Sequence, residues 1–298
     1  MPTKYIKKEG AAVINIARYL MSQKEGARLR TIDSLAEEFE LSVGLVQKAL
    51  KKIEADGVIA LSRQGRNGTY ISRLDSEEIV RLAGLGHVVC AMPLPYTKHY
   101  EGLASGLKAQ MSSLPLYFAH MRGASVRAKL LSSGVHDIAI MSKLAAQSYS
   151  DGLTVAVNLG KNSYSNDHRV IYRKGEYSAI RRVGVDSDSP DQQILTKQAF
   201  PDQDIDIVEI NYGDSLVHLA SRNIDAVIWL TEAIDMGNVG LAEKSLNHIP
   251  QCEMASEAVL LVRNEAPHIK VLLRNLINKD ALISHQKKVV TGEITPSY

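Results

Sequence analysis

Hydrophobic residues recur at intervals of three and four positions through the first sixty residues, which is the spacing of amphipathic helices. Three helices are predicted, the first over about 11–22. Hydroxyls of Thr31 and Ser42 can cap the second and third, and Gly57 supplies a left-handed residue that ends the third. The predicted apolar stripes are Val13, Ile16, Ala17 and Leu20 in the first helix, Ile32, Leu35, Ala36 and Phe39 in the second, and Val46, Ala49, Leu50 and Ile53 in the third.

Two short β-type runs, 58–61 and 69–72, follow the third helix and flank the glycine-containing turn 63–68. Two helices, a tight turn and a β-ribbon form the plan of a winged helix-turn-helix. One residue conflicts with this plan. Glu40 stands in the turn between the helices, where such motifs favour glycine, and a left-handed glutamate costs about 1 kcal/mol. Either a different turn is used or burial of Leu41 offsets the cost.

The exposed face of the third helix carries small and hydrogen-bonding residues, which let a recognition helix approach base edges in a major groove. Two arginines in the following turn suit phosphates or a minor groove. The predicted contacts to double-stranded operator DNA are Arg28, Arg30, Thr31, Ser42, Gly44, Gln47, Lys48, Lys51, Arg63 and Arg66. The alternative is a helical hairpin that only packs against the rest of the protein. Capping, turn and charge together favour DNA binding.

Charge is unevenly distributed along the chain. The net charge of +2 hides an excess of five positive charges in residues 1–73, where thirteen lysines and arginines face eight acidic residues. The remainder carries three net negative charges. Positive charge is therefore concentrated where DNA binding is predicted.

The pattern changes after a predicted linker, 74–86, in which Ser76 could cap a short helix over 77–83. Strands and helices then alternate twice, which predicts an α/β fold with parallel sheets covered by helices. The first series is a strand at 88–92, a helix at 97–111, a strand at 116–119, a helix at 125–133 and a strand at 138–141. The second is a strand at 182–185, a helix from 189 to 200, a strand at 206–210, a helix at 215–221 and a strand at 226–229.

The two series end alike, since a helix, a turn and an aspartate precede the last strand of each. We interpret residues 87–298 as two related lobes joined by crossing segments near 155–172 and 258–263. This is the sequence shape of a type 2 periplasmic-binding-protein fold. The overall prediction is an N-terminal winged helix-turn-helix domain, residues 1–73, joined to a two-lobed α/β domain.

Lobes of this kind hold a ligand at the carboxyl ends of their strands, where the amino-termini of helices point into the cleft. Arg122 could act as a bidentate clamp on a small anionic or zwitterionic effector. Each candidate could equally be a solvated loop residue. The predicted ligand-binding residues are Pro95, Tyr96, His120, Arg122, Ser142 and Lys143 in the first lobe, and Asp186, Ser187, Ser189, Tyr212, Trp229 and Thr231 in the second.

Several stretches resemble bacterial regulators. Residues 34–59, SLAEEFELSVGLVQKALKKIEADGVI, look like the reader domain of GntR-type repressors. Over its whole length the chain resembles the YhfZ family of regulators. The stretches that carry this second resemblance are YIKKEG (5–10), GRNGTY (65–70), VVCAMPLPYTKHYEGLASGLKAQ (88–110), AHMRGA (119–124), DAVIW (225–229) and the final PSY.

The family resemblance implies a DNA-binding transcriptional regulator whose C-terminal part has a periplasmic-binding-protein-like fold, and it does not supply the effector. The GntR pattern is not fully met. Val43 and Gln47 occupy the positions where those repressors usually carry two base-reading arginines. Their operator preference therefore cannot be transferred to this chain.

The remaining features favour a cytoplasmic homodimeric regulator. No apolar run approaches membrane-spanning length, and the first residues lack the apolar core of a signal peptide. Cys90 and Cys252 stand far apart, without the spacing of a disulfide framework or a zinc site, and are expected to be buried.

The alternative is a cytoplasmic enzyme on the same two-lobed fold with an accessory winged helix. No catalytic triad, metal-spaced cluster or phosphate-binding glycine loop supports it, so no catalytic, metal or cofactor residue is predicted. If the protein were an enzyme, deletion of residues 1–73 would leave its catalytic activity intact.

Overall fold

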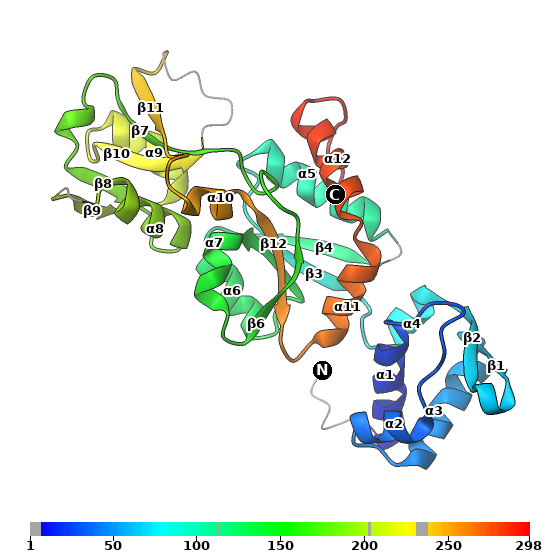
Figure 1. Ribbon diagram of the computed structural model, residues 1–298. Coiled ribbons are helices and arrows are strands. Elements are labelled where there is room, and N and C mark those ends of the chain that lie inside the picture. Colours follow the sequence, from blue (N-terminus) through cyan, green and yellow to red (C-terminus); the bar gives the residue numbers. More distant parts are fainter. Residues whose placement is uncertain (1–6, 113, 202–203, 231–237) are drawn as a thin grey trace. The chain divides into compact units, whose positions relative to one another are not determined.

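The computed structural model describes residues 7–112, 114–201, 204–230 and 238–298 (Figure 1). It divides into two compact units. The N-terminal unit comprises the described residues of Met1–Val88, Ser113–Pro115 and His268–Asn275. The C-terminal unit comprises those of Val89–Ser112, Leu116–Pro267 and Leu276–Tyr298.

The N-terminal unit has a helical core followed by a β-ribbon. Its elements are α1 (Lys8–Leu20), α2 (Ile32–Glu38), α3 (Val43–Ala55), β1 (Ile59–Arg63), β2 (Thr69–Leu74) and α4 (Ser76–Leu82). The predicted caps are confirmed, because Thr31 Oγ1 accepts a hydrogen bond from the Ser34 amide at 3.2 Å and Ser42 Oγ accepts one from the Leu45 amide at 3.4 Å. α1 begins three residues earlier than predicted.

Most of the predicted apolar stripes form the core of this unit. Ile16, Leu20, Leu35 and Ile53 are fully or almost fully buried. The residues at the edges of the stripes, Val13, Ile32 and Phe39, are only half-buried.

The predicted linker contains α4, which contributes to this core. Ile79 and Val80 are buried, and the Arg18 side chain donates to the Ala83 carbonyl at 3.3 Å. The cap of α4 is Asp75, whose carboxylate accepts from the Glu78 amide at 3.1 Å, and not the predicted Ser76. Asp75 takes this role because its carboxylate can reach an amide three residues ahead.

The β-ribbon, called the wing below, is longer than predicted. β1 and β2 pair antiparallel from Arg63 with Thr69 to Ile59 with Leu74. Gly68 has a φ of +98°, and a Cβ atom at this position would lie 2.7 Å from Arg28 Nε. Only glycine meets both the backbone conformation and this close approach, so the NG pair of the wing has a structural reason.

The C-terminal unit contains two five-stranded sheets, each in its own lobe (Figure 1). The first lobe has the strand order β4-β3-β5-β12-β6 and the second has β11-β7-β10-β8-β9. The strands are β3 (Val88–Met92), β4 (Leu116–His120), β5 (Ile138–Ser142), β6 (Leu153–Asn158), β7 (His168–Arg173), β8 (Arg182–Val185), β9 (Asp206–Glu209), β10 (Ala226–Leu230), β11 (Leu241–Ser245) and β12 (Ala258–Arg263). The helices are α5 (Lys98–Gln110), α6 (Ala124–Ser132), α7 (Lys143–Ala146), α8 (Pro190–Ala199), α9 (Ser215–Ala220), α10 (Gln251–Ser256) and α12 (Lys279–Val290), and α11 (Pro267–Leu276) precedes α12.

The predicted parallel pairs are confirmed, since β3 pairs parallel with β5, and β8 pairs parallel with β9 and β10. The sheets are nevertheless mixed. β12 runs antiparallel to both β5 and β6, and β7 runs antiparallel to both β10 and β11. Strand β11 was not predicted, because its sequence LAEKS lacks a clear apolar pattern.

One predicted crossing segment is misplaced. Residues 258–263 form β12 inside the first sheet, and the chain passes between the lobes just before it, through 246–257. The apolar run AVLLV is buried at every position, so it is a core strand and not a connection. The other predicted crossing segment contains the connection from β6 to β7.

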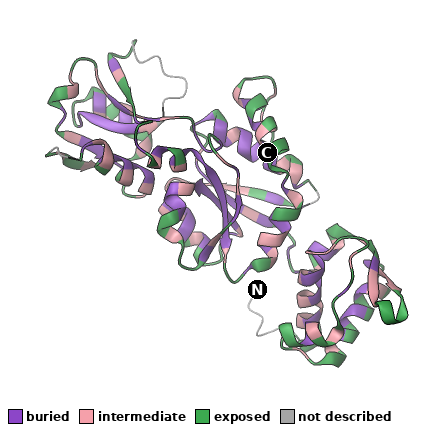
Figure 2. Ribbon diagram, in the orientation of Figure 1, coloured by how far each residue is buried: buried purple, intermediate pink, exposed green. Residues whose placement is uncertain are grey.

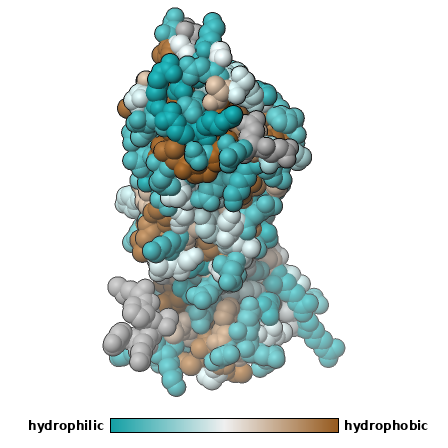
Figure 3. Space-filling view, turned by 90° about the vertical axis from the view of Figure 1, so that its left-hand side faces the viewer, coloured by the Kyte–Doolittle hydropathy of each residue, from teal (hydrophilic) through white to brown (hydrophobic). Residues whose placement is uncertain are grey.

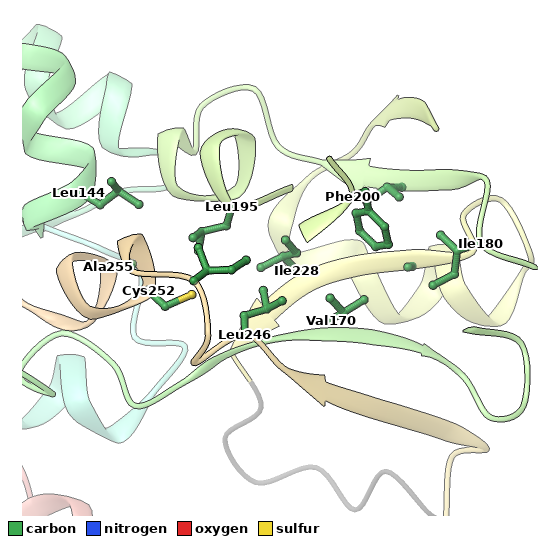
Figure 4. Packing of buried hydrophobic residues seen from close by; sticks show 12 residues of the cluster. Leu144, Val170, Ile180, Leu195, Phe200, Ile228, Leu246, Cys252 and Ala255 are labelled. Atoms are coloured by element: carbon green, nitrogen blue, oxygen red, sulfur yellow. The ribbon is translucent and has the colours of Figure 1, made fainter. Parts of the chain in front are cut away.

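Buried residues concentrate in the central strands of both sheets, as Figure 2 shows for β3, β5 and β12. The core of the second lobe is drawn in Figure 4, where Leu195, Phe200, Ile228 and Val170 pack from α8, the residue after it, β10 and β7. Cys252 lies in the same cluster and Cys90 is buried in β3, as predicted. Burial raises the pKa of the Cys252 thiol to about 11.

The edge of the second sheet is more exposed than its centre. β9 has mostly exposed residues, and Ile207 in β9 and Val217 in α9 are among the large apolar side chains that the second lobe exposes. On the face shown in Figure 3, hydrophilic residues cover most of the surface and hydrophobic residues gather in separate patches.

Helices α5 and α12 pack closely because α5 has glycine at two contact positions. A Cβ atom on Gly102 would lie 3.0 Å from the Gln286 Cα atom, and one on Gly106 would overlap a Leu282 methyl group. Gln286 is itself buried and donates to the carbonyls of His99 and Ser163. These glycines therefore serve helix packing.

Glu40 has a φ of +52°, so the left-handed turn is used despite its cost. Glu40 is exposed and Leu41 is only half-buried, whereas the Leu41 amide donates to the Ala36 carbonyl at 2.9 Å. We expect Glu40→Gly to raise the free energy of unfolding by about 0.5–1 kcal/mol, because glycine adopts this conformation without strain.

Chemical denaturation of the full chain measures this effect. The matched control is Glu37→Gly, an exposed position inside α2, which should lower the free energy of unfolding by about 1 kcal/mol. Destabilisation by both substitutions would show that the turn carries no strain.

Candidate DNA interface and ligand cavity

The predicted recognition helix presents the predicted polar face. Gly44, Gln47, Lys48 and Lys51 are exposed on α3, while Val46, Ala49, Leu50 and Ile53 are buried on the opposite side. A groove of about 870 Å³ runs beside this face. The groove is lined by six of the ten predicted DNA-binding residues, which are Arg28, Arg30, Thr31, Gln47, Lys51 and Arg63. Ser42, Gly44, Lys48 and Arg66 lie outside its lining.

Several cations of this surface already have acidic partners. Lys48 pairs with Glu9 of α1 at 2.5 Å, Arg63 forms a two-pronged pair with Glu54 of α3, and Arg30 pairs with Glu38. Hydrogen bonding to Glu54 raises the pKa of Arg63. Arg66 at the tip of the wing is exposed and makes no ion pair or hydrogen bond within the described part of the chain, so its guanidinium is available.

A cavity of about 70 Å³ lies between the two lobes of the C-terminal unit. Of the twelve predicted ligand-binding residues, Tyr96, Arg122, Asp186, Ser189 and Tyr212 line it. Six others do not: Pro95, His120, Ser142, Lys143, Ser187 and Trp229. Thr231 lies outside the described residues.

The predicted residues outside the cavity have structural partners. The Lys143 ammonium pairs with Glu257 at 3.0 Å, Ser187 Oγ donates to Glu209, and His120 Nδ1 lies 2.9 Å from the Pro93 carbonyl oxygen. Trp229 contacts the ring of Tyr212 edge-on. Ser142 caps α7 and donates to Asp191, so it supports a residue of the cavity wall.

The sequence did not indicate six polar residues of the wall, which are Tyr100, Arg127, Tyr164, His168, Asp191 and Gln192. Arg127 and Tyr100 lie inside predicted helices, where nothing in the sequence indicates that they face a cavity. Tyr164 lies in the connection between β6 and β7, and His168 is the first residue of β7. One signal was available, because four of the twelve tyrosines in the chain line this cavity. Burial raises the pKa of Tyr100 and Tyr164, which keeps their hydroxyls protonated.

Contacts across the cavity hold the two lobes together. Arg122 in the first lobe bonds to Asn211 and lies 3.6 Å from an Asp186 oxygen and 3.7 Å from an Asp188 oxygen in the second. Ser142 Oγ donates to Asp191 at 2.7 Å. Asp186 also accepts from the amides of Asp188 and Tyr212, so the charge of Arg122 is compensated within the protein.

Two buried groups that line the cavity in the second lobe have shifted pKa values. Burial raises the pKa of Asp191 to about 6, although the Ser142 hydroxyl and the Arg127 charge act to lower it. Burial lowers the pKa of His168 to about 4, so its imidazole is neutral at pH 7. Its Nδ1 atom is buried and has no hydrogen-bond partner among the described residues.

No described helix is both long and apolar enough to cross a membrane. Nowhere in the described part of the chain do three histidine, cysteine or acidic side chains gather as a metal site would require.

Comparison with known sequences decides the family. The model of the YhfZ C-terminal domain matches residues 75–298, and that of a helix-turn-helix domain matches residues 24–71. The chain belongs to the YhfZ family. It is 46% identical over 301 residues to the YhfZ protein of Escherichia coli K12, and the match covers 100% of both chains.

Solved structures agree with this assignment. The crystal structure of YhfZ from Shigella flexneri matches with a TM-score of 0.67 and 44% identity, over 75% of this chain and 98% of that one. The periplasmic aliphatic sulphonate binding protein SsuA from Escherichia coli matches with a TM-score of 0.53 and 11% identity, over 70% of this chain and 75% of that one. This second likeness shows the fold alone.

The predicted fold class is therefore confirmed: a helix-turn-helix domain is joined to a two-lobed α/β domain of the periplasmic-binding-protein type. This is the organisation of a DNA-binding regulator with a binding-protein-like domain.

The raised pKa of Asp191 predicts a pH dependence of stability. The unfolded chain ionises this carboxyl near 3.8, whereas the folded protein holds the proton up to about 6. The free energy of unfolding should therefore fall, by about 3 kcal/mol, as the pH rises from about 4 to above 6. Asp191→Asn keeps an oxygen for the Ser142 hydroxyl but cannot ionise, so it should remove this contribution.

Denaturant unfolding over a series of pH values measures the difference between variant and wild type. Asp206→Asn, at an exposed carboxylate of the same lobe, is the control and should leave the pH profile unchanged. The burial argument fails if Asp191→Asn follows the wild-type profile.

Proposed function

We propose that this protein is a homodimeric transcriptional regulator that binds a palindromic operator and responds to a small anionic or zwitterionic effector in the cavity between its lobes. One observation carries the proposal: the chain that holds an exposed polar recognition face on α3 also holds a polar cavity lined from two lobes. A candidate DNA-binding surface and a candidate ligand cavity thus occur in one polypeptide.

The DNA contacts have different roles according to their chemistry. The Gln47 amide on α3 can read a base edge, whereas Arg63 and Arg66 in the wing hold the flanking phosphates. Two copies of α3 in a dimer would lie about 34 Å apart to enter successive major grooves.

The effector would act by closing the lobes. A ligand that contacts both lobes stabilises the closed arrangement, and this shifts the population between DNA-bound and free forms. Such a ligand would add to the contacts that Arg122 and Ser142 already make across the cavity.

Gln47→Ala tests base reading. The substitution should cost about 1–3 kcal/mol of discrimination between the operator and other sequences, because it removes a side chain that can bond to a base edge. Selection of bound sequences from a random duplex pool gives the operator, which should contain inverted half-sites about one helical turn apart. Fluorescence anisotropy with the selected and a scrambled duplex then measures discrimination, and equal losses on both duplexes would contradict the role of Gln47.

Arg66→Ala tests the wing. It should weaken binding to all duplexes similarly and reduce the slope of log affinity against log salt by about 0.9 for each phosphate that the variant no longer binds. Arg222→Ala, at an exposed arginine in the second lobe, is the matched control and should leave the slope unchanged. An unchanged slope for Arg66→Ala would show that the wing does not contact the backbone.

A further inference from the structure

The wall of the cavity contains a buried positive charge that forms no ion pair among the described residues. Arg127 on α6 is only 3% exposed. Its guanidinium donates to the carbonyls of Ile140 at 3.0 Å and Met121 at 2.9 Å, and to the Tyr164 hydroxyl at 3.3 Å. All three acceptors are neutral. No acidic side chain pairs with Arg127 among the residues that the structure describes, and two of the five N–H groups of a guanidinium remain for another acceptor.

Two other arginines of this unit have the acidic partners that Arg127 lacks. Arg122 faces Asp186 and Asp188, and Arg173 pairs with Glu176 and Asp225 at 2.7 and 2.8 Å. A charge buried without a counter-ion is costly. An anion in the cavity would supply the missing partner of Arg127.

The amino-terminal ends of two helices also favour an anion in the cavity. Gly123 and Ala124 at the start of α6, and Ser189 and Pro190 at the start of α8, line the cavity. Gly123 has no side chain that could cap α6, and the first turn of this helix is only partly satisfied from outside, where the Ser125 amide donates to the Asp188 carbonyl at 3.4 Å. The amino-termini of helices attract anions.

The charge and size of the cavity limit the charge and size of the anion that can bind there. The unpaired guanidinium of Arg127 can bind one negative charge, and the carboxyl of Asp191 in the same wall opposes a second. A carboxylate can accept both remaining N–H groups side by side. A volume of about 70 Å³ holds about five to seven waters at 10–15 Å³ each, so a three-carbon acid fits.

His168 offers a second polar contact in the cavity wall. Burial keeps its imidazole neutral, and its Nδ1 atom is buried without a hydrogen-bond partner among the described residues. Buried polar atoms are almost always hydrogen-bonded in native proteins. A hydroxyl or an amine on the ligand could satisfy this atom.

We propose that the cavity binds a small carboxylate that carries a hydroxyl or an amine, with the carboxylate on Arg127 and the second polar group beside His168. This inference rests on the proposed function, in which the cavity is the effector site, and it names the chemical class of the effector. Arg127 replaces Arg122 as the anchor, because Arg122 already has its counter-ions.

Matched three-carbon probes test the proposal on the full chain. Lactate and alanine carry both groups, propionate lacks the second polar group, and lactamide lacks the charge. Isothermal titration should show lactate or alanine binding at least about tenfold more tightly than both propionate and lactamide, since each lacks one hydrogen-bonding or charged group. Failure of both lactate and alanine to bind, or tighter binding of inorganic phosphate, would overturn the carboxylate class.

Substitutions locate the site. Arg127→Gln should abolish the binding of the tighter probe, whereas Arg263→Gln should retain it, because Arg263 also donates to carbonyls in the first lobe but lies outside the cavity lining. If Arg127→Gln does not fold, Arg127→Lys keeps the charge and should bind at least about tenfold more weakly, since it loses the paired geometry. Unchanged binding in the Arg127 variant that folds would overturn the assignment.

Operator binding measured in the same samples separates this inference from the proposed function. A probe that binds through Arg127 without changing the affinity for the selected duplex would support the ligand class and contradict effector control of DNA binding. Conversely, a duplex affinity that responds to some other compound equally in wild type and Arg127→Gln would support the regulator and overturn the role of Arg127.

Discussion

The guanidinium of Arg127 fixes the wall of the cavity, because it connects three parts of the first lobe. It bonds to a carbonyl within β5, to the carbonyl just after β4 and to a hydroxyl in the connection from β6 to the second lobe. A hydrophobic side chain here would cost less to bury. The first lobe therefore has a charged group at the ends of its strands, next to the connection to the second lobe. This group makes the cavity wall polar.

The charges of the proposed DNA-binding surface differ from Arg127, because they are exposed. Lys48 and Arg63 pair with Glu9 and Glu54, and such surface pairs contribute little to stability. In the proposed complex these pairs would hold the two cations in place, on α3 and in the wing, before DNA binds. Binding would exchange a carboxylate for a phosphate at each position, which involves less desolvation than the burial of a free charge.

Periodicity predicted the helices, strands and lobes well, since apolar spacing reflects burial directly. It failed where other forces decide. β11 is polar because it lies at a sheet edge, and the sequence pattern predicts a connection at β12 although every residue of its AVLLV run is buried. The candidate site was predicted only in part. Loop residues such as Tyr96 and Arg122 follow from the rule that ligands bind at strand ends. Arg127 and Asp191 do not, because a polar residue inside a helix looks solvent-exposed until the packing of both lobes is known.

Helix α11 bears on how such a chain could evolve. It lies between β12 and α12 in the sequence, yet His268–Asn275 belongs to the N-terminal unit, where the Asn275 amide donates to the Met21 carbonyl at 3.2 Å. The helix-turn-helix unit is thus not one uninterrupted segment of the chain. A recombination event that exchanged only residues 1–88 would bring in a new partner for a helix encoded some 180 codons downstream. The coding segments of residues 1–88 and 268–275 are therefore expected to be inherited together.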